Sequence, residues 1–149
     1  MSVARRLTLV ALALVVLTVS AHAQDAKVTV VAILANESNQ PTDPKLKELA
    51  NEVKKHEPRL TSYRIERTTV KPLNVGQKES FALVNDVTAD VTVVSKDDGK
   101  QRVGLKVKPP TVGEISYVIN YNKFLPIITR HVSANERLII AVMVQPPAK

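Results

Sequence analysis

Side chains suited to acid–base, nucleophilic or metal chemistry are few in this chain of 149 residues, which contains three histidines and no cysteine. His56 and His131 lie beyond the N-terminal segment, and neither has a carboxylate or a second histidine at the spacing of a metal site. The serines lack the Gly-x-Ser-x-Gly motif that exposes a catalytic nucleophile. The sequence therefore indicates no catalytic residue, no cofactor and no metal, and it leaves a hydrolase without a recognisable motif as an alternative.

Asp97 and Asp98 precede Gly99, an arrangement that also occurs in calcium-binding loops. The further oxygen ligands that such a loop needs do not follow. Aspartate and glycine favour tight turns, because aspartate bonds its own backbone and glycine tolerates left-handed conformations. We therefore interpret this tripeptide as a turn between two strands.

Basic residues outnumber acidic ones by 21 to 14 and gather in two parts of the chain. The first part runs from Lys54 to Lys78 and the second from Lys96 to Lys108. A solvated outer sheet face accounts for such charge, since charged side chains also keep strand edges from aggregating. The functional alternative is a surface that binds an anionic polymer. The candidate residues of this anion-binding face are Arg102, Lys106, Lys108 and Arg64.

The first 23 residues have the pattern of a signal peptide. Arg5 and Arg6 form a basic n-region, residues 7–21 carry no charge, and Ala-His-Ala at 21–23 is a small-x-small cleavage site. The uncharged run of fifteen residues is shorter than the about 20 that span a bilayer, which argues against a retained membrane anchor. We therefore predict an exported protein, periplasmic or extracellular, whose mature chain begins at Gln24.

Export limits the partners that we expect for the domain. Removal of the leader leaves 19 basic residues against 14 acidic ones, a formal charge of +5. A basic domain prefers anionic neighbours, which outside the inner membrane are acidic polysaccharides, lipid headgroups and cell-wall polymers. Nucleic acid is not expected as a partner, because export and the lack of clustered aromatic residues count against a base-stacking surface. With no cysteine for a disulfide or a lipid anchor, packing alone must stabilise the domain.

The elements that would position these residues are mostly strands. Aromatic residues make up 3% of the chain, so valine, isoleucine and leucine must fill the core, which favours a sheet. Residues 28–34 and 138–144 are apolar on both alternating faces, as strands covered on both sides are. We expect these two strands to be central, which brings the two ends of the mature chain close together in the sheet.

One helix is predicted over residues 44–56. Asp43 is suited to cap its first turn, Pro44 fits its first position, and Pro58 prevents its continuation. Such a short helix is marginal in isolation and depends on packing. Its predicted buried stripe consists of Leu46, Leu49, Ala50 and Val53.

A hairpin around Gly99 is the most closely determined local structure. In a three-residue loop that ends with Gly99 in the left-handed conformation, Val93 pairs with Val103, and Val91 pairs with Leu105. The apolar side chains then meet, which a two-residue Asp-Gly turn does not achieve. We therefore predict the three-residue loop.

This register has consequences for charge. It directs Arg102, Lys106 and Lys108 outward, because the intervening residues face the core. It also sets Asp90 opposite Lys106 on the outer face of the sheet. The outward basic row thus follows from core burial, whether or not it binds a ligand.

Four segments carry a resemblance to other proteins: Asp-Pro-Lys-Leu at 43–46, Leu-Thr-Ser-Tyr-Arg at 60–64, Lys-Phe-Leu-Pro-Ile-Ile-Thr-Arg at 123–130 and Glu-Arg-Leu-Ile-Ile-Ala-Val-Met-Val at 136–144. Together they resemble an uncharacterised family of small exported bacterial proteins of planctomycete type. The resemblance implies a compact exported domain and brings no activity, cofactor or site residue.

The predicted fold is a single exported α+β domain over residues 24–149, a mostly antiparallel sheet or sandwich of seven or eight strands with one helix packed on it. The predicted function is a non-enzymatic binding or structural module of the cell envelope with a basic sheet face. One alternative is an accessory subunit of an envelope assembly, joined by strand pairing at the edge Phe124–Val132, where Pro126 indicates an edge position or a bulge. The other alternative is the hydrolase without a recognisable motif.

Overall fold

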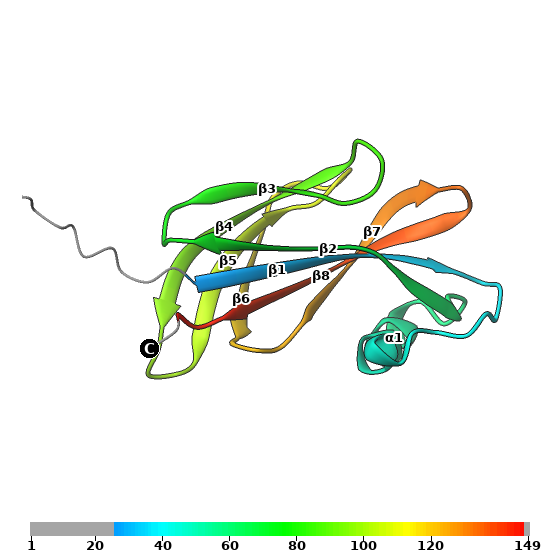
Figure 1. Ribbon diagram of the computed structural model, residues 1–149, viewed down its shortest axis with the longest axis horizontal. Coiled ribbons are helices and arrows are strands. Elements are labelled where there is room, and N and C mark those ends of the chain that lie inside the picture. Colours follow the sequence, from blue (N-terminus) through cyan, green and yellow to red (C-terminus); the bar gives the residue numbers. More distant parts are fainter. Residues whose placement is uncertain (1–25, 148–149) are drawn as a thin grey trace, which may run out of the picture.

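The computed structural model describes residues 26–147, which form eight strands and one helical segment (Figure 1). In chain order, the elements are β1 (Ala26–Asn36), η1 (Pro44–Leu46), α1 (Lys47–His56), β2 (Ser62–Leu73), β3 (Lys78–Ala82), β4 (Thr88–Asp97), β5 (Arg102–Lys108), β6 (Ile115–Asn120), β7 (Leu125–Ser133) and β8 (Glu136–Gln145). The predicted leader, residues 1–23, and the predicted first mature residue, Gln24, lie outside the described residues. Within residues 26–147, no helix has the length and apolar character needed to cross a membrane.

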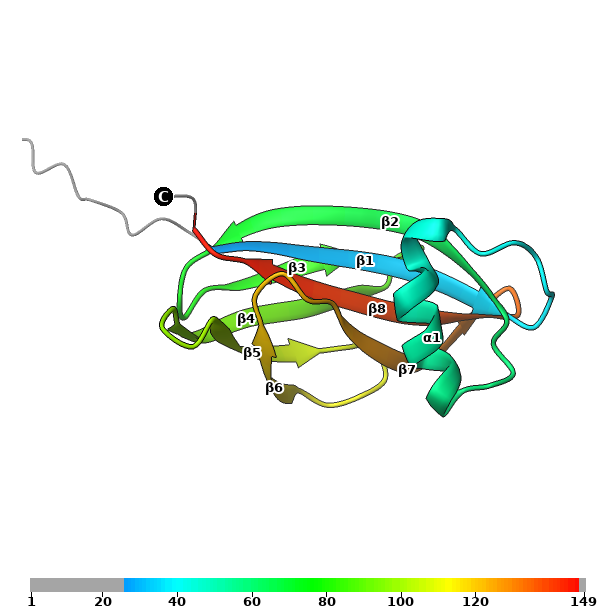
Figure 2. The same cartoon turned by 90° about the horizontal axis from the view of Figure 1, so that it is seen from below.

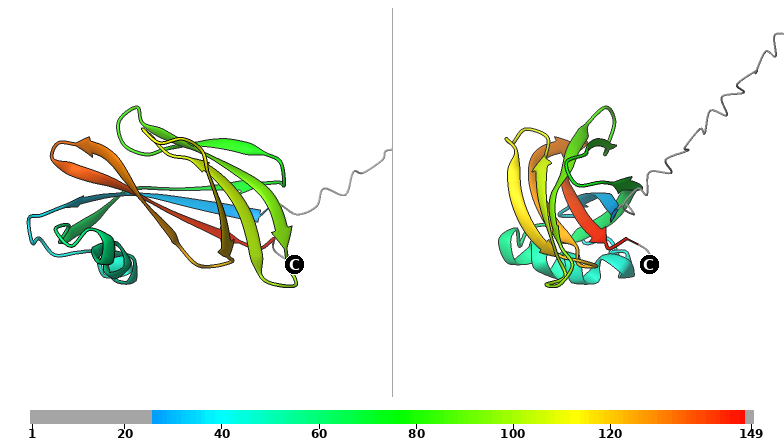
Figure 3. Two further views of the ribbon diagram at one scale, coloured as in Figure 1. Left: turned by 180° about the vertical axis from the view of Figure 1, so that it is seen from behind. Right: turned by 90° about the vertical axis from the view of Figure 1, so that its left-hand side faces the viewer.

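The strands form two antiparallel sheets of four strands each. Sheet A has the order β2-β1-β8-β7, and sheet B has the order β3-β4-β5-β6. Consecutive strands are neighbours except where the chain passes between the sheets, after β2 and after β6. Since β1 also pairs with β8, the fold is a meander flattened into a two-layer sandwich, which Figure 3 shows from behind and from one end.

The structure confirms the predicted fold class: a small α+β domain with eight strands in two antiparallel sheets and one helix. It also confirms the central position of the first and last strands. β1 lies between β2 and β8, with Val28 opposite Val144 and Leu34 opposite Leu138. The two ends of the described chain therefore lie side by side at one end of sheet A (Figure 1).

The main core fills the space between the sheets. On β1, every second side chain from Val28 to Leu34 faces sheet B and is at most 3% exposed. Sheet B and the loop after β3 supply the opposite layer, whose largest members are fully or almost fully buried: Phe81, Leu83, Leu105, Val91, Val93 and Val107. Burial of this much apolar surface is the main source of the stability of a cysteine-free domain.

The helix covers one end of the outer face of sheet A (Figure 2). The Asp43 side chain accepts a hydrogen bond of 2.9 Å from the backbone N–H of Lys45, which confirms the predicted cap. The first turn is a 3-10 turn, η1, and α1 begins at Lys47. The predicted apolar stripe of the helix, which consists of Leu46, Leu49, Ala50 and Val53, is confirmed as buried. It packs against alternate residues of β1 and β8.

The predicted register of the β4–β5 hairpin is wrong. Asp97 pairs with Arg102, so the loop has four residues, 98–101, and the left-handed residue is Gln101 (φ 55) rather than Gly99. Within the strands Val93 pairs with Leu105 instead of Val103.

The longer loop has a tertiary cause. The Tyr121 hydroxyl donates a hydrogen bond of 2.9 Å to the Asp98 carboxylate, and the Tyr121 N–H donates one of 3.0 Å to the Gln101 carbonyl. A register shift between Val93 and Ser95 takes up the extra length of β4. From Asp90 to Val93 the pairing moves by two residues, so these residues and Lys106 keep their predicted faces, and Asp90 lies opposite Lys108 rather than Lys106. Between the register shift and the loop the pairing moves by three residues, so Lys96 lies opposite the core residue Val103.

Candidate functional site

Three of the four predicted anion-binding residues lie on the outer face of sheet B. Arg102, Lys106 and Lys108 are exposed on β5, as predicted. The residues between them include Val103, Leu105 and Val107, each at most 1% exposed in the core. Burial of one face of β5 therefore fixes the direction of its basic face.

A fourth cation joins them from β3. Lys78 lies opposite Thr92 on β4, and Thr92 lies opposite Lys106 on β5, so the two lysines stand in one row across the sheet. Strands two apart are separated by about 10 Å. In the sequence, Lys78 ends the first basic part of the chain, but its alternation with the buried Phe81 is a signal that could have placed it on this face, together with Ser80. We call Lys78, Arg102, Lys106 and Lys108 the basic face.

Three carboxylates lie among these cations, but most are engaged by other groups. The Ser80 hydroxyl donates a hydrogen bond of 2.5 Å to Asp90. The Lys100 N–H donates one of 3.2 Å to Asp97. Glu114 lies 4.0 Å from the Lys106 ammonium, at the limit of an ion pair. Within residues 26–147, no carboxylate oxygen lies within 4.0 Å of Lys78, Arg102 or Lys108.

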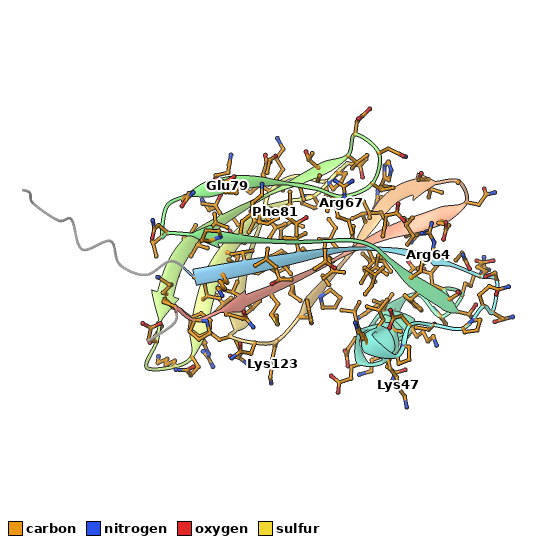
Figure 4. All side chains as sticks on the ribbon, in the orientation of Figure 1. Lys47, Arg64, Arg67, Glu79, Phe81 and Lys123 are labelled. Carbon is orange, nitrogen blue, oxygen red and sulfur yellow. The ribbon has the colours of Figure 1, made fainter. Side chains whose placement is uncertain are left out.

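Arg64, the remaining predicted site residue, lies elsewhere. It belongs to β2 in sheet A, near the end of the sandwich that carries the helix (Figure 4). Its guanidinium contacts Glu136 at 2.7 Å and Glu66 at 2.6 Å. The structure therefore does not bring Arg64 together with the basic face, and its charge is already paired.

These contacts change the ionisation of both partners. Hydrogen bonds to Glu136 and then to Glu66 raise the pKa of the Arg64 guanidinium. The same hydrogen bond from Arg64 lowers the pKa of the Glu136 carboxyl, opposed by desolvation, and a hydrogen bond from Asn36 adds to the lowering. A carboxylate held in its ionised form in this way is a poor general acid.

A hollow of about 580 Å³ opens beside this ion pair, between the β7–β8 turn and the loop that follows β1. Its charged lining includes Glu136, which Arg64 holds, and Arg137, which pairs with Glu57 at 3.1 Å. Asn36 also contributes, through a hydrogen bond of 3.2 Å to Glu136. Glu136 and Arg137 are therefore both paired with residues outside the lining of the hollow, Arg64 and Glu57.

The basic residues of the first part of the chain, from Lys54 to Lys78, do not form one surface. Lys54 lies over the ring of Tyr63, 5.9 Å from its centroid, and Lys55 pairs with Glu52 on the helix. Lys71 of β2 bridges the two sheets: its ammonium donates to the Ser80 carbonyl at 2.7 Å and lies 5.1 Å from the ring centroid of Phe81. Figure 4 labels Phe81 on β3 beside this seam. These cations serve local packing.

Of the two histidines that the structure describes, His56 lies at the exposed end of α1 and His131 is half-buried on β7. In the part of the chain that the structure describes, no three side chains of histidine, aspartate or glutamate gather as metal ligands would. Asp97 and Asp98 act in the turn, which confirms the interpretation of that tripeptide as turn chemistry.

The fold and the site define a small antiparallel sandwich with an outward basic face. Comparison with family models, with curated proteins and with solved structures found no match to this chain. The resemblance to exported proteins of planctomycete type therefore stays a prediction.

Proposed function

We propose that the protein is a non-enzymatic binding module of the cell envelope, which binds an anionic polymer through the basic face of sheet B. The observation that carries this proposal is a set of exposed cations, Lys78, Arg102 and Lys108, that a packed sheet holds in fixed directions. Within residues 26–147, none of the three has a carboxylate oxygen within 4.0 Å.

The spacing of the basic face suits a repeating ligand better than a single small anion. Along β5, Lys106 and Lys108 are separated by about 7 Å, and Arg102 and Lys108 by about 20 Å, at roughly 3.3 Å per residue. A lone phosphate or sulfate can contact neighbouring cations such as Lys106 and Lys108, but it cannot also contact Arg102. A linear polymer with an anionic group on each repeat unit meets them in turn, and such contacts are weak singly and additive together.

The nearby carboxylates set the expected strength. Since Asp90, Asp97 and Glu114 lie among the four cations, the face has a formal charge of only +1. Binding would therefore be weak and sensitive to salt, because exposed charges are screened beyond about 8 Å at physiological ionic strength. The exported location and the envelope role belong to this proposal and rest on the predicted leader.

Retention on an immobilised acidic polysaccharide tests the proposal. We expect the protein to bind at low salt and to elute as salt rises. The triple variant Arg102→Gln, Lys106→Gln, Lys108→Gln should lose retention while its melting temperature stays nearly unchanged, because all three side chains are exposed.

A variant with the same change of charge on another surface is the control. Lys45, Lys47 and Lys55 are exposed on the helical segment, and their replacement by glutamine should leave most of the retention intact. Equal loss in both triple variants would indicate attraction by net charge alone and would refute a specific face. Failure of the unaltered protein to bind at low salt would refute polymer binding altogether.

A further inference from the structure

Each sheet of the sandwich ends in two edge strands, and three of these four edges are protected against pairing with another strand. β2 has a register shift opposite Ala32 and Ile33, and also carries Pro72 near its end. β3 has five residues, and Lys71 already binds its Ser80 carbonyl. β7, the edge predicted for strand pairing, contains Pro126 and a register shift between Ile128 and Val132.

The fourth edge, β6, has none of these features. Its six residues, Ile-Ser-Tyr-Val-Ile-Asn, contain no charge and no proline, and they pair with β5 without a register shift. Val118 on its outer face is 72% exposed, the largest value among the exposed large apolar residues. Figure 2 shows β6 at the edge of sheet B. An uncharged, regular edge strand of this kind is a template for another strand.

The direction of its free backbone groups follows from one hydrogen bond. The Tyr121 N–H donates to the Gln101 carbonyl at 3.0 Å, which makes this a hydrogen-bonded pair of the β5–β6 ladder. Such pairs alternate in antiparallel sheets, so Ile119 and Tyr117 also bond to β5. The N–H and C=O groups of the alternate residues therefore point away from β5 and into solvent: Ser116, Val118 and Asn120.

We propose that β6 pairs in antiparallel fashion with β6 of a second copy of this chain, in a symmetric register centred on Val118. In this register Val118 faces Val118 of the second copy, Tyr117 faces Ile119, and Ser116 faces Asn120. Each pair joins side chains of similar character. Each residue whose backbone N–H and C=O groups point away from β5 exchanges both hydrogen bonds with its counterpart. A register centred on Tyr117 leaves Asn120 opposite Glu114, outside the strand, and so completes fewer of these bonds.

Self-pairing is favoured over a foreign strand because the sequence around Val118 is symmetric in character. Reading outward from Val118 in either direction, an apolar residue is followed by a polar one, so the edge is complementary to itself in antiparallel orientation. Charge does not oppose this. The nearest cations across the join, Arg102 and Lys106 of the other copy, stand three strand spacings or about 14 Å apart, beyond the screening length.

The symmetry also determines the shape of the pair. A two-fold axis through an antiparallel strand pair runs perpendicular to the sheet, so the outer faces of both copies of sheet B lie on one side. The two basic faces then form one continuous surface. One strand pair buries less area than a permanent interface, so we expect a weak dimer whose population rises with concentration. Dimer formation itself does not depend on polymer binding, and its test contains no polymer.

Sedimentation of the purified protein at micromolar to millimolar concentrations tests the proposal. The protein is used in the form in which it is found in the cells that produce it. We expect the mass to rise from that of one chain toward that of two. Val118→Pro removes only an outward-pointing N–H, so it should keep the protein monomeric while the fold persists. The control Val118→Thr keeps the N–H and a β-branched side chain and should still form the dimer.

Single cysteines in this cysteine-free chain test the register directly. In the proposed pair, the two Val118 Cα atoms lie about 5.5 Å apart, within disulfide range, whereas the two Ser116 Cα atoms lie about 14 Å apart. Val118→Cys should therefore form a disulfide-linked dimer under mild oxidation, and Ser116→Cys should not. This comparison needs no proline variant to fold.

Three results would overturn the proposal. The first is a protein that stays monomeric at millimolar concentration. This result would overturn the proposal even if a foreign strand were found to bind β6. The second is association of Val118→Pro as strong as that of the unaltered protein. The third is cross-linking of Ser116→Cys as fast as that of Val118→Cys.

Discussion

Arg64 on β2 and Glu136 on β8 are joined across the end of β1 by two hydrogen bonds, from Nη2 to Oε1 at 2.7 Å and from Nε to Oε2 at 3.2 Å. Asn36 on the intervening strand donates a further bond of 3.2 Å to the same carboxylate. These contacts connect three adjacent strands at the end of sheet A. The parallel pair of bonds gives fixed geometry to a contact that would otherwise be a loose surface ion pair.

Replacement of Glu136 by glutamine should destabilise the domain. Glutamine keeps the shape but removes the charge, and Arg64 is then left with a weaker acceptor. Since the Arg64 side chain is 53% exposed, solvent screens the pair, and we expect a loss of about 1 kcal/mol in the free energy of unfolding. Urea denaturation measures it. Glu79→Gln, which loses a 3.7 Å contact with Lys71, is the control and should cost less than about 0.5 kcal/mol.

The effect of Glu136→Gln should depend on pH. Because the pKa of Glu136 is lowered in the folded state, its carboxylate stabilises the fold above its unfolded pKa of about 4.3. That contribution is lost as the pH falls through the folded pKa, where both states are protonated. The difference between the unaltered protein and Glu136→Gln should therefore be full at neutral pH and disappear in acid. A difference that stays constant across this range would contradict the ion pair as its cause.

Truncation of the helix stripe should be more costly. Leu49 is 8% exposed and packs in the core between α1 and sheet A, so Leu49→Ala should lower the free energy of unfolding by about 2 to 3 kcal/mol, the lower part of the range for buried leucines. Thermal or urea unfolding measures this loss. Lys47→Ala, on the exposed side of the same helix, should change stability by less than about 0.5 kcal/mol. Similar values for both variants would show that the helix does not depend on its packing.

Much of this architecture is readable in the sequence because it depends on local alternation. β1 and β8 are apolar on both faces, and the structure places a sheet on one side and the helix on the other. The helix cap at Asp43 and the stripe that includes Val53 are likewise local patterns. The outward direction of Lys106 survives an error in register, since a slip of two residues preserves the face of each side chain.

The rest depends on contacts between distant segments. On β2, simple alternation predicts that Ile65 and Arg67 share a face, but the register shift sets them opposite Ile33 and Ala32, on opposite faces of the sheet. Arg64 is paired with Glu136, which lies 72 residues away in the chain. No local pattern reveals such a contact, and so the predicted anion-binding set combined residues of two different sheets.

The register shift in the β4–β5 hairpin changes which of its two glycines, Gly99 or Gly104, we expect to resist substitution. A Cβ atom added to Gly104 would collide with the Ser95 Oγ and lie 3.1 Å from Val94 Cγ2. A Cβ atom added to Gly99 would meet only the Asp97 Oδ1, at an ordinary 3.6 Å, and Gly99 does not have a positive φ. Gly104→Ala should therefore cost about 1 to 3 kcal/mol in unfolding free energy, the range for overpacking, whereas Gly99→Ala should cost little.

A double variant separates the collision from other effects of alanine. Ser95→Ala removes the Oγ that a side chain at position 104 would meet, so Gly104→Ala should cost less in that background than in the unaltered protein. Urea denaturation of the two single variants and the double variant gives this coupling. If Gly99→Ala were the costly change and Gly104→Ala were neutral, the three-residue loop with a left-handed Gly99 would be correct. Val93 would then pair with Val103, and Lys106 would return to its place opposite Asp90.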